Sequence, residues 1–210
     1  MAKRNTKSYS KFNYDDLDEL GIETVVVDLF AGQQIAPVAA SEWLKDSLRK
    51  GAKFSLNTEK AKSEFIIAPI LNELHENNES VFAVYSGFNF NVDATRGLQG
   101  FCDFLLAKLP LNIVPKSPII AVVEAKLNDV ITAAVPQCAA EMFAARLWND
   151  KRGEPSETIY GVITTGNVWQ FLRYKQGNIV EIDTQIYNLK ELDTLLGVWQ
   201  HIINQFKKSV

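Results

Sequence analysis

The sequence predicts an α/β protein in which a central sheet is flanked by helices. Three observations predict this class: a helical apolar stripe over 58–76, three consecutive strand-like runs between 80 and 126, and a second helical segment over 127–150. Further strand-like runs fill 158–189, and an apolar helix over 189–206 closes the chain. The chain has 210 residues, of which 47% are hydrophobic, so it can bury the core of one sizeable domain.

The N-terminal part, 1–57, is expected to be an extension packed on a core formed by 58–210. Residues 1–12 are polar and basic and are expected to form a disordered or loosely docked arm. A short acidic helix, a strand over 22–30 and a helix over 41–50 follow. Ser41 is the expected N-cap of that last helix, and Gly51 follows its expected end.

Apolar residues in the helix 58–76 recur at spacings of three and four, which predicts one buried stripe. The stripe consists of Ala61, Phe65, Ala68, Leu71 and Leu74. Glu64 lies at the edge of this stripe, where a carboxylate needs a partner. Pro69 removes one backbone hydrogen bond from this helix and is expected to kink it.

The most informative stretch is Pro118 to Lys126, an aliphatic run that ends in Glu-Ala-Lys. Successive side chains of a strand point to opposite faces, so Glu124 and Lys126 are expected on the same face. Asp103 interrupts the preceding apolar strand, where an unpaired charge would be costly. The two strands therefore bring an acid, a second acid and an amine towards one place.

An aspartate in one strand, followed by Glu-X-Lys at the end of the next, resembles the PD-(D/E)XK nuclease superfamily. Glu124 follows Asp103 by 21 residues, a separation that suits a hairpin, and Cys102 stands where the family motif often has proline. The resemblance covers about 58–187. It implies a restriction endonuclease-like fold, with an αβββαβ core around a mixed central sheet flanked by helices.

The resemblance also implies Mg²⁺ as the cofactor, with Mn²⁺ as a substitute. Its expected ligands are Asp103, Glu124, the carbonyl of Ala125, and Glu64, for which a boundary ion pair is an equally good explanation. Lys126 would orient and polarise the attacking water, although neighbouring carboxylates favour its charged form over a basic amine. Gln137 matches a glutamine that reaches the active site in the family, with an ordinary first-turn glutamine as the alternative.

The expected function is that of a metal-dependent endonuclease that hydrolyses phosphodiester bonds, with DNA as the partner, in defence or DNA processing. The net charge of −3 and the absence of an evident DNA-reading segment favour the alternative, a non-catalytic binding or interaction module that retains the nuclease fold. In a third interpretation, Glu124 and Lys126 form an ordinary structural ion pair. A homodimer or a partner specificity subunit is compatible with each of these.

Other classes are less compatible with the sequence. No apolar segment reaches spanning length and no signal sequence is evident, so a cytoplasmic protein without a membrane partner is expected. Cys102 and Cys138 are expected as core residues, and neither histidine has zinc-site spacing. The basic run over 45–62 is either a solvated helix surface or a surface that binds phosphates. Trp169 and Phe171 either pack in the core or stack on bases.

Overall fold

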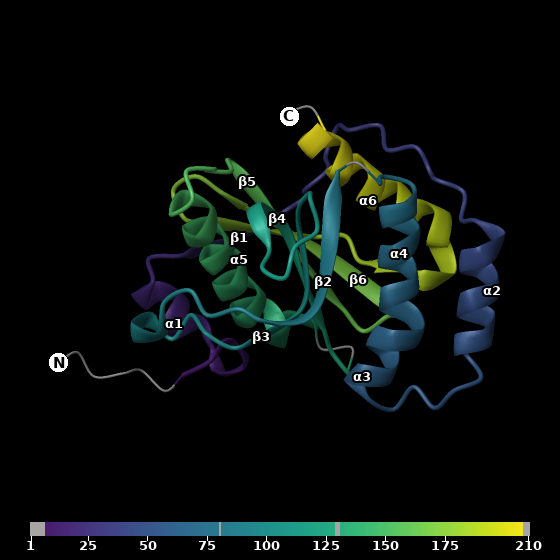
Figure 1. The fold of residues 1–210 in the computed structure, drawn as a ribbon, viewed down its shortest axis with the longest axis horizontal. Helices are drawn as coiled ribbons and strands as arrows, with labels where there is room; N and C mark the ends of the chain where they lie inside the picture. Colours follow the sequence, from purple (N-terminus) through teal and green to yellow (C-terminus); the bar gives the residue numbers. More distant parts are fainter. Residues whose placement is uncertain (1–6, 80, 129–130, 208–210) are drawn as a thin grey trace.

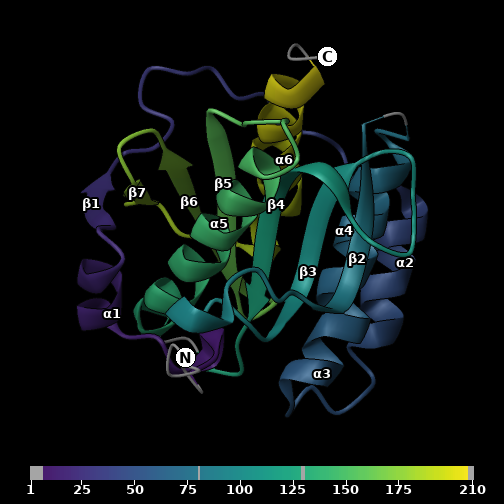
Figure 2. The same cartoon turned by 60° about the vertical axis from the view of Figure 1, so that its left-hand side comes forward.

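A mixed β-sheet runs through the centre of the computed structural model, which describes residues 7–79, 81–128 and 131–207. Seven strands follow the spatial order β1-β7-β6-β5-β4-β3-β2, and β8 pairs with β6 outside this order. Figure 2 shows this order from β1 on the left to β2 on the right. The strand bounds are β1 Glu23–Val27, β2 Phe82–Asn89, β3 Phe101–Lys108, β4 Lys116–Ala125, β5 Thr158–Thr164, β6 Val168–Lys175, β7 Ile179–Asp183 and β8 Tyr187–Asn188.

The sheet combines antiparallel and parallel pairs. β2, β3 and β4 form an antiparallel meander, β4 is parallel to β5, β5, β6 and β7 are antiparallel, and β1 is parallel to β7. The parallel step from β4 to β5 is made through helix α5, as a crossover between parallel strands requires. The predicted α/β class with a mixed, helix-flanked sheet is confirmed. The strand of the N-terminal extension, β1, is an edge strand of this same sheet.

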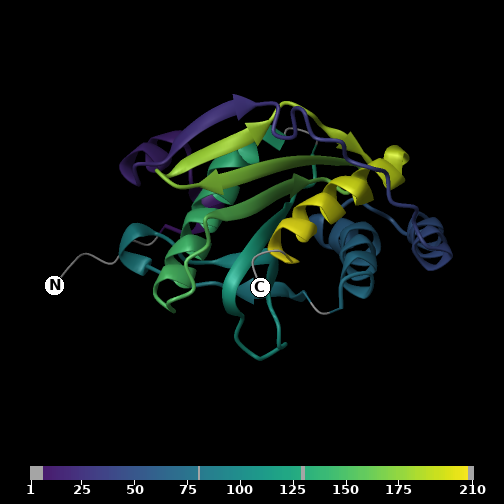
Figure 3. The ribbon, with the colours of Figure 1, turned by 90° about the horizontal axis from the view of Figure 1, so that it is seen from above.

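Helices cover both faces of the sheet. Their bounds are α1 Tyr14–Glu19, α2 Glu42–Gly51, α3 Glu59–Lys62, α4 Ala68–Glu76, α5 Val135–Asp150 and α6 Leu192–Lys207. One hydrophobic core lies between the sheet and α5 with α1, and a second lies between the sheet and α2, α4 and α6. Figure 1 shows the sheet between α5 on the left and α2, α4 and α6 on the right, and Figure 3 shows these three helices together from above.

The helix starts follow the expected capping chemistry. The Ser41 hydroxyl accepts a hydrogen bond from the N–H of Leu44 at 3.1 Å, which confirms Ser41 as the N-cap of α2. Thr58 caps α3 in the same way, through the N–H of Ala61. These caps fix where α2 and α3 begin, and therefore where the loop between them lies.

The expected long helix over 58–76 is interrupted by a π-helical turn, Ser63–Ile67, between α3 and α4. Pro69 follows in the first turn of α4, where its missing N–H cannot bond to the carbonyl four residues earlier. The wider turn shifts the buried face to Ile66, Ile67, Ile70, Leu71 and Leu74. The prediction that Ala61, Phe65 and Ala68 lie on the buried face is therefore wrong, since each is only partly buried.

Helix α5 packs very closely on the centre of the sheet. A Cβ atom at Gly161 of β5 would lie 2.4 Å from the Met142 sulfur and 2.8 Å from the Cys138 sulfur, so only glycine allows this approach without a shift. At the other end of α5, the buried side chain of Asn149 accepts from the N–H of Ile119 at 2.7 Å and donates to the Ile119 carbonyl at 2.9 Å. These contacts fix α5 relative to β4, on which the candidate site depends.

The described N-terminal residues, from Lys7 onwards, are docked against the domain. Tyr9 is 1% exposed, its hydroxyl donates to the carbonyl of Phe90 at 2.9 Å, and its N–H donates to the carbonyl of Gln99 at 3.1 Å. The expectation of a disordered or loosely docked arm is therefore wrong for 7–12. Residues 1–6, the rest of that expected arm, lie outside the described residues.

The two cysteines and the helix lengths agree with the sequence patterns. Cys102 and Cys138 are both buried free thiols, as expected for core residues. Among the helices described, none combines the length and the apolar composition needed to cross a membrane.

Candidate active site

The site begins where β3 and β4 separate at one end. The backbone pairing of these strands extends as far as Phe104 and Val123. Beyond that pair, the Asp103 side chain replaces the backbone of β3 as the hydrogen-bond partner of β4. Its Oδ2 atom accepts a hydrogen bond from the N–H of Ala125 at 2.7 Å. The N–H and C=O of a residue in an antiparallel pair point to the same neighbour, so the Ala125 carbonyl also faces the side of Asp103.

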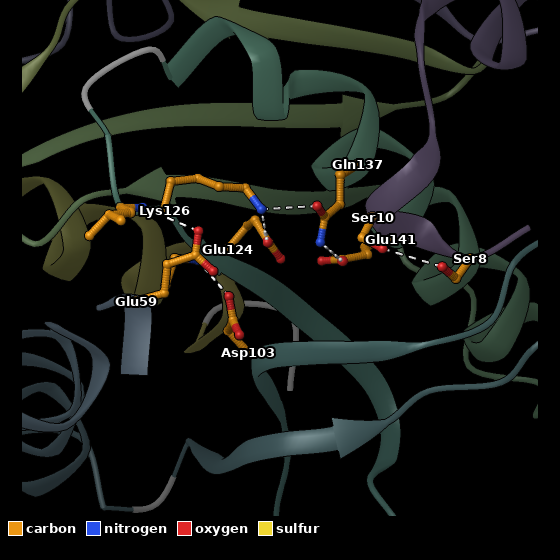
Figure 4. Close-up of polar contacts among 10 residues, drawn as sticks. Ser8, Ser10, Glu59, Asp103, Glu124, Lys126, Gln137 and Glu141 are labelled. Atoms are coloured by element: carbon orange, nitrogen blue, oxygen red, sulfur yellow. Dashed lines mark hydrogen bonds and ion pairs between the residues drawn. The ribbon is translucent and has the colours of Figure 1, made fainter. Parts of the chain in front are cut away.

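Glu124 and Lys126 share one face at the end of β4, as the strand period predicts. The Lys126 Nζ atom lies 2.5 Å from Glu124 Oε1, and the two side chains are 25% and 4% exposed. The backbone N–H of Lys126 donates to the carbonyl of Thr164 at 2.8 Å, which ties the end of β4 to β5. Figure 4 shows both side chains near Asp103.

Helix α5 adds Gln137 and Glu141, which lie one helical turn apart. Gln137 Oε1 accepts from Lys126 Nζ at 3.0 Å, and its Nε2 donates to Glu141 Oε1 at 3.1 Å. Glu141 is fully buried. A chain of polar contacts thus runs from Glu124 through Lys126 and Gln137 to Glu141 (Figure 4). The structure brings Gln137 into contact with Lys126, so it is more than a surface glutamine in a first turn.

The two buried glutamates are electrostatically unfavourable as ions. The Oε2 atoms of Glu124 and Glu141 are both buried, and neither has a hydrogen-bond partner within the described part of the chain. Burial, followed by the negative charge of Asp103, raises the pKa of Glu124 to about 7, although Lys126 opposes the shift. Burial and the charge of Glu124 raise the pKa of Glu141 well above its ordinary value. Additional positive charge at this place would relieve the cost.

Asp103 and Lys126 respond to the same surroundings. Burial raises the pKa of Asp103, while the Ala125 N–H and the charge of Lys126 act in the opposite direction. For Lys126, burial lowers the pKa, but the carboxylates of Glu124, Glu59 and Asp103 more than offset it, so its pKa is raised. Lys126 is therefore a cation at neutral pH and a hydrogen-bond donor.

Glu59 is a member of this cluster that the sequence analysis missed. Its Oε1 atom accepts from the N–H of Leu127 at 3.2 Å, and Lys62, one turn later on α3, donates from Nζ to the Leu127 carbonyl at 2.6 Å. The pair attaches α3 to the residue directly after Lys126. Glu59 lies in the first helical turn after the Thr58 cap, where acids are common because they stabilise the helix. Its position in the sequence therefore did not indicate a role in the site.

Glu64 does not have the predicted position beside the buried face. Its Oε1 atom lies 3.1 Å from Lys60 Nζ, and its side chain is 51% exposed. The π-helical turn that contains Glu64 displaces the face of the helix, so the expected stripe edge points to solvent. The expected position of Glu64 at the edge of the buried face is wrong, and its contact with Lys60 agrees with the alternative explanation, an ion pair. Glu59 is the acid of this helical segment that approaches the site.

A cavity of about 290 Å³ opens beside Lys126. Its lining consists of Ser10, Phe12, Glu59, Lys126, Leu127, Asn128, Ala133, Ala134 and Gln137. The docked N-terminal residues form part of the wall, and Figure 4 shows Ser8 and Ser10 on the side of Glu141. A larger cavity, about 550 Å³, lies near Pro118 and Thr158 at the opposite ends of β4 and β5 and contains none of the residues described above.

The oxygen atoms at the β3–β4 separation suit a hard cation. Within the described ranges, no three His, Cys, Asp or Glu side chains are grouped as a metal site. Mg²⁺, however, is commonly held by one or two carboxylates and keeps several waters. Asp103, the unpartnered Oε2 of Glu124 and the Ala125 carbonyl meet that requirement. The residues present therefore fit Mg²⁺ or Mn²⁺.

The remaining residues weighed from the sequence have structural roles. Asp93 lies in the loop between β2 and β3 and caps a short 3₁₀ turn, where its carboxylate accepts from the N–H of Thr95 and from Nε of Arg96. Trp169 and Phe171 are fully buried, which confirms core packing over base stacking.

Known proteins do not assign the site. The sequence matches no family model and no curated protein.

Proposed function

We propose that this protein is a Mg²⁺-dependent endonuclease of the PD-(D/E)XK type that hydrolyses phosphodiester bonds of DNA. The observation that carries the proposal is the meeting of Asp103, Glu124 and Lys126 at one strand end, with a buried Glu124 oxygen that lacks a partner among the described residues. Glu124 and Glu141 are buried beside Asp103, and the charge of Lys126 does not offset the cost of burying these carboxylates as ions, which is costly for a purely structural role. In metal-dependent hydrolysis of a phosphodiester, the carboxylates would hold the ion and the lysine would stabilise negative charge on the phosphate.

Asp103, Glu124 and the Ala125 carbonyl would hold the cation. Such an ion supplies positive charge that stabilises the phosphate oxygens as negative charge develops on them. Asp103 has a second role, because its bond to the Ala125 N–H fixes the end of β4 and therefore aims Glu124.

Lys126 would donate hydrogen bonds to the attacking water or to a phosphate oxygen. Its raised pKa keeps it charged, so it stabilises negative charge and does not remove the proton of the attacking water. Glu124 and Gln137 hold its Nζ atom from two sides, which limits the positions that the amine can take. Glu141 orients Gln137 in turn.

The proposal is tested by cleavage of supercoiled plasmid and of single-stranded DNA with Mg²⁺ or Mn²⁺. Asp103→Asn and Lys126→Ala are each expected to reduce the rate by about 100-fold or more, the scale for loss of a catalytic group. Asp93→Asn is the matched control, because Asp93 lies on a separate turn, and it should cut like wild type. Equal cutting by all four proteins, or none by wild type, would overturn the proposal.

A second candidate is a module that keeps this architecture and binds DNA or a protein partner without cutting. The observation that favours it is that the Lys126 amine already donates hydrogen bonds to Glu124 and Gln137 without any substrate. A folded wild-type protein that binds DNA but neither Mn²⁺ nor Mg²⁺ would support this candidate over the nuclease. A homodimer or a specificity subunit would be compatible with both.

A further inference from the structure

An exposed pair of stacked aromatic rings lies on the helical segment next to the candidate site. The rings of Phe54 and Phe65 have centroids 4.2 Å apart and planes that differ by 5°. Phe54 is 56% exposed although the ring of Phe65 stacks on it, so a large part of the Phe54 side chain is open to solvent. Most large apolar side chains of this protein are buried, and a flat, open aromatic face is suited to binding another ring.

The backbone around the pair fixes its geometry. Gly51 at the end of α2 packs so closely on the π-helical turn that a Cβ atom there would lie 2.6 Å from the Phe65 carbonyl oxygen. The N–H of Phe54 donates to the Gly51 carbonyl at 3.0 Å, which closes the turn that carries the ring. The stacked pair is therefore held in place before any ligand arrives.

The surroundings of the pair are basic. Segment 45–65 contains six lysine or arginine residues and three aspartate or glutamate residues, a formal charge of +3 in a chain whose net charge is −3. Arg49 and Lys50 share Asp46 as an ion-pair partner, and Lys53 is exposed directly beside Phe54. An aromatic face within local positive charge complements a ligand that is both planar and anionic.

The pair also lies near the residues that flank the site. Glu59 and Lys62 of α3 both bind Leu127, the residue after Lys126. Phe65 follows Glu59 by six residues, about 9 Å along a helix at 1.5 Å per residue. Figures 1 and 2 show α3 beneath the sheet, next to the loop that leads from α2. A chain bound at the cavity could therefore extend to Phe54.

We propose that the Phe54–Phe65 pair is a stacking platform for an unpaired base of single-stranded DNA, with Lys53 at its phosphates. This inference rests on the proposed nuclease function and names its substrate class. Bases within a duplex have both faces covered by neighbours, whereas a single strand can place a base on an aromatic ring. Charge complementarity favours nucleic acid over an apolar protein segment, because Lys53 is exposed beside the ring and segment 45–65 has a formal charge of +3.

The test measures binding of a fluorescein-labelled oligothymidylate and of a labelled duplex, in EDTA so that cleavage does not interfere. Phe54→Ala is expected to weaken single-strand binding roughly 5- to 150-fold, the range for loss of one base–aromatic stack, and to leave duplex binding unchanged. Phe54→Tyr keeps the ring and should bind like wild type. Trp43→Ala is the matched control, since Trp43 is 50% exposed at the other end of α2.

A further variant tests the phosphate contact. Lys53→Gln should reduce the slope of log affinity against log salt by about 0.7, the value for one phosphate contact on a single strand. Equal single-strand binding by wild type and Phe54→Ala, or a loss that Trp43→Ala reproduces, would overturn the inference. Because binding is measured without metal, Phe54-dependent binding by a protein that cuts no DNA would refute the nuclease proposal alone.

Discussion

The buried carboxylates at the end of β4 predict an unusual dependence of stability on pH. Glu124 is an acid whose folded-state pKa is raised from 4.5 to about 7. Below pH 4.5 it is protonated in both the folded and the unfolded chain, and it contributes nothing to the difference. Between pH 4.5 and 7 the unfolded chain loses this proton first, so the free energy of unfolding falls as pH rises.

The size of the fall follows from the shift. A rise of the pKa from 4.5 to about 7 corresponds to roughly 3 kcal/mol of stability lost by pH 8. Glu141 acts in the same direction, because its pKa is raised as well. Glu124→Gln removes the first contribution and, by removing the charge of Glu124, reduces the second. The loss of stability from pH 5 to pH 8 should therefore shrink by about 3 kcal/mol in this variant.

Urea unfolding at a series of pH values measures this directly, and the slope against pH is the readout. The absolute stability of Glu124→Gln also reflects the altered contact with Lys126, so the change with pH and not the absolute value is compared. Glu76→Gln removes an exposed carboxylate at the end of α4 and supplies the matched control. Added Mg²⁺ should restore wild-type stability at pH 8 more than that of Glu124→Gln, because the ion binds the ionised folded form.

Two results would refute this reasoning. A wild-type protein whose stability stays constant or rises from pH 5 to pH 8 would mean that Glu124 is not held at a raised pKa. A slope that Glu124→Gln leaves unchanged would place the responsible group elsewhere.

Three further predictions concern single side chains. Asn149→Ala leaves the backbone of Ile119 unpaired in the core and should lower the free energy of unfolding by about 2 kcal/mol or more in urea denaturation, and an unchanged midpoint would contradict it. Glu59→Gln should weaken Mg²⁺ affinity, measured by calorimetry, roughly 10- to 100-fold, as mutation of other outer partners of metal sites does. Glu64→Gln should leave the affinity unchanged, and a larger loss in Glu64→Gln than in Glu59→Gln would place Glu64 at the site instead. Gln137→Ala removes one of two hydrogen bonds on the lysine amine and should slow DNA cleavage by folded protein roughly 10-fold or more, and full activity would exclude Gln137 from the reaction.

The sequence predicted the sheet and the core of the site because both depend on strand periodicity. Alternation in β3 and β4 gives each side chain a face, and a hairpin brings neighbouring strands to one edge, so Asp103, Glu124 and Lys126 had to be near one another once the strands were recognised. Gln137 could be expected on the first turn of the next helix. Its bond to Lys126 depends on how α5 packs over Gly161, which no local pattern indicates.

The helical residues of the site were harder to predict because a π-helical turn breaks the 3.6-residue period. Periodicity placed Glu64 at the edge of the buried face, but the wider turn at Ser63–Ile67 exposes it. Glu59 lies before that turn and reaches Leu127 instead. Tyr9 was missed for another reason, since its polar and basic neighbours suggest a disordered segment while its own ring is buried.

We propose that Asp103 and Glu124 hold a divalent cation beside Lys126. Binding of Mn²⁺ followed by electron paramagnetic resonance, in wild type and in Asp103→Asn, tests it most directly. The proposal predicts one specifically bound ion per wild-type chain and an affinity weakened about 10-fold or more in Asp103→Asn, which loses a ligand charge. Equal Mn²⁺ binding by the two proteins, or no binding by folded wild type, would contradict it.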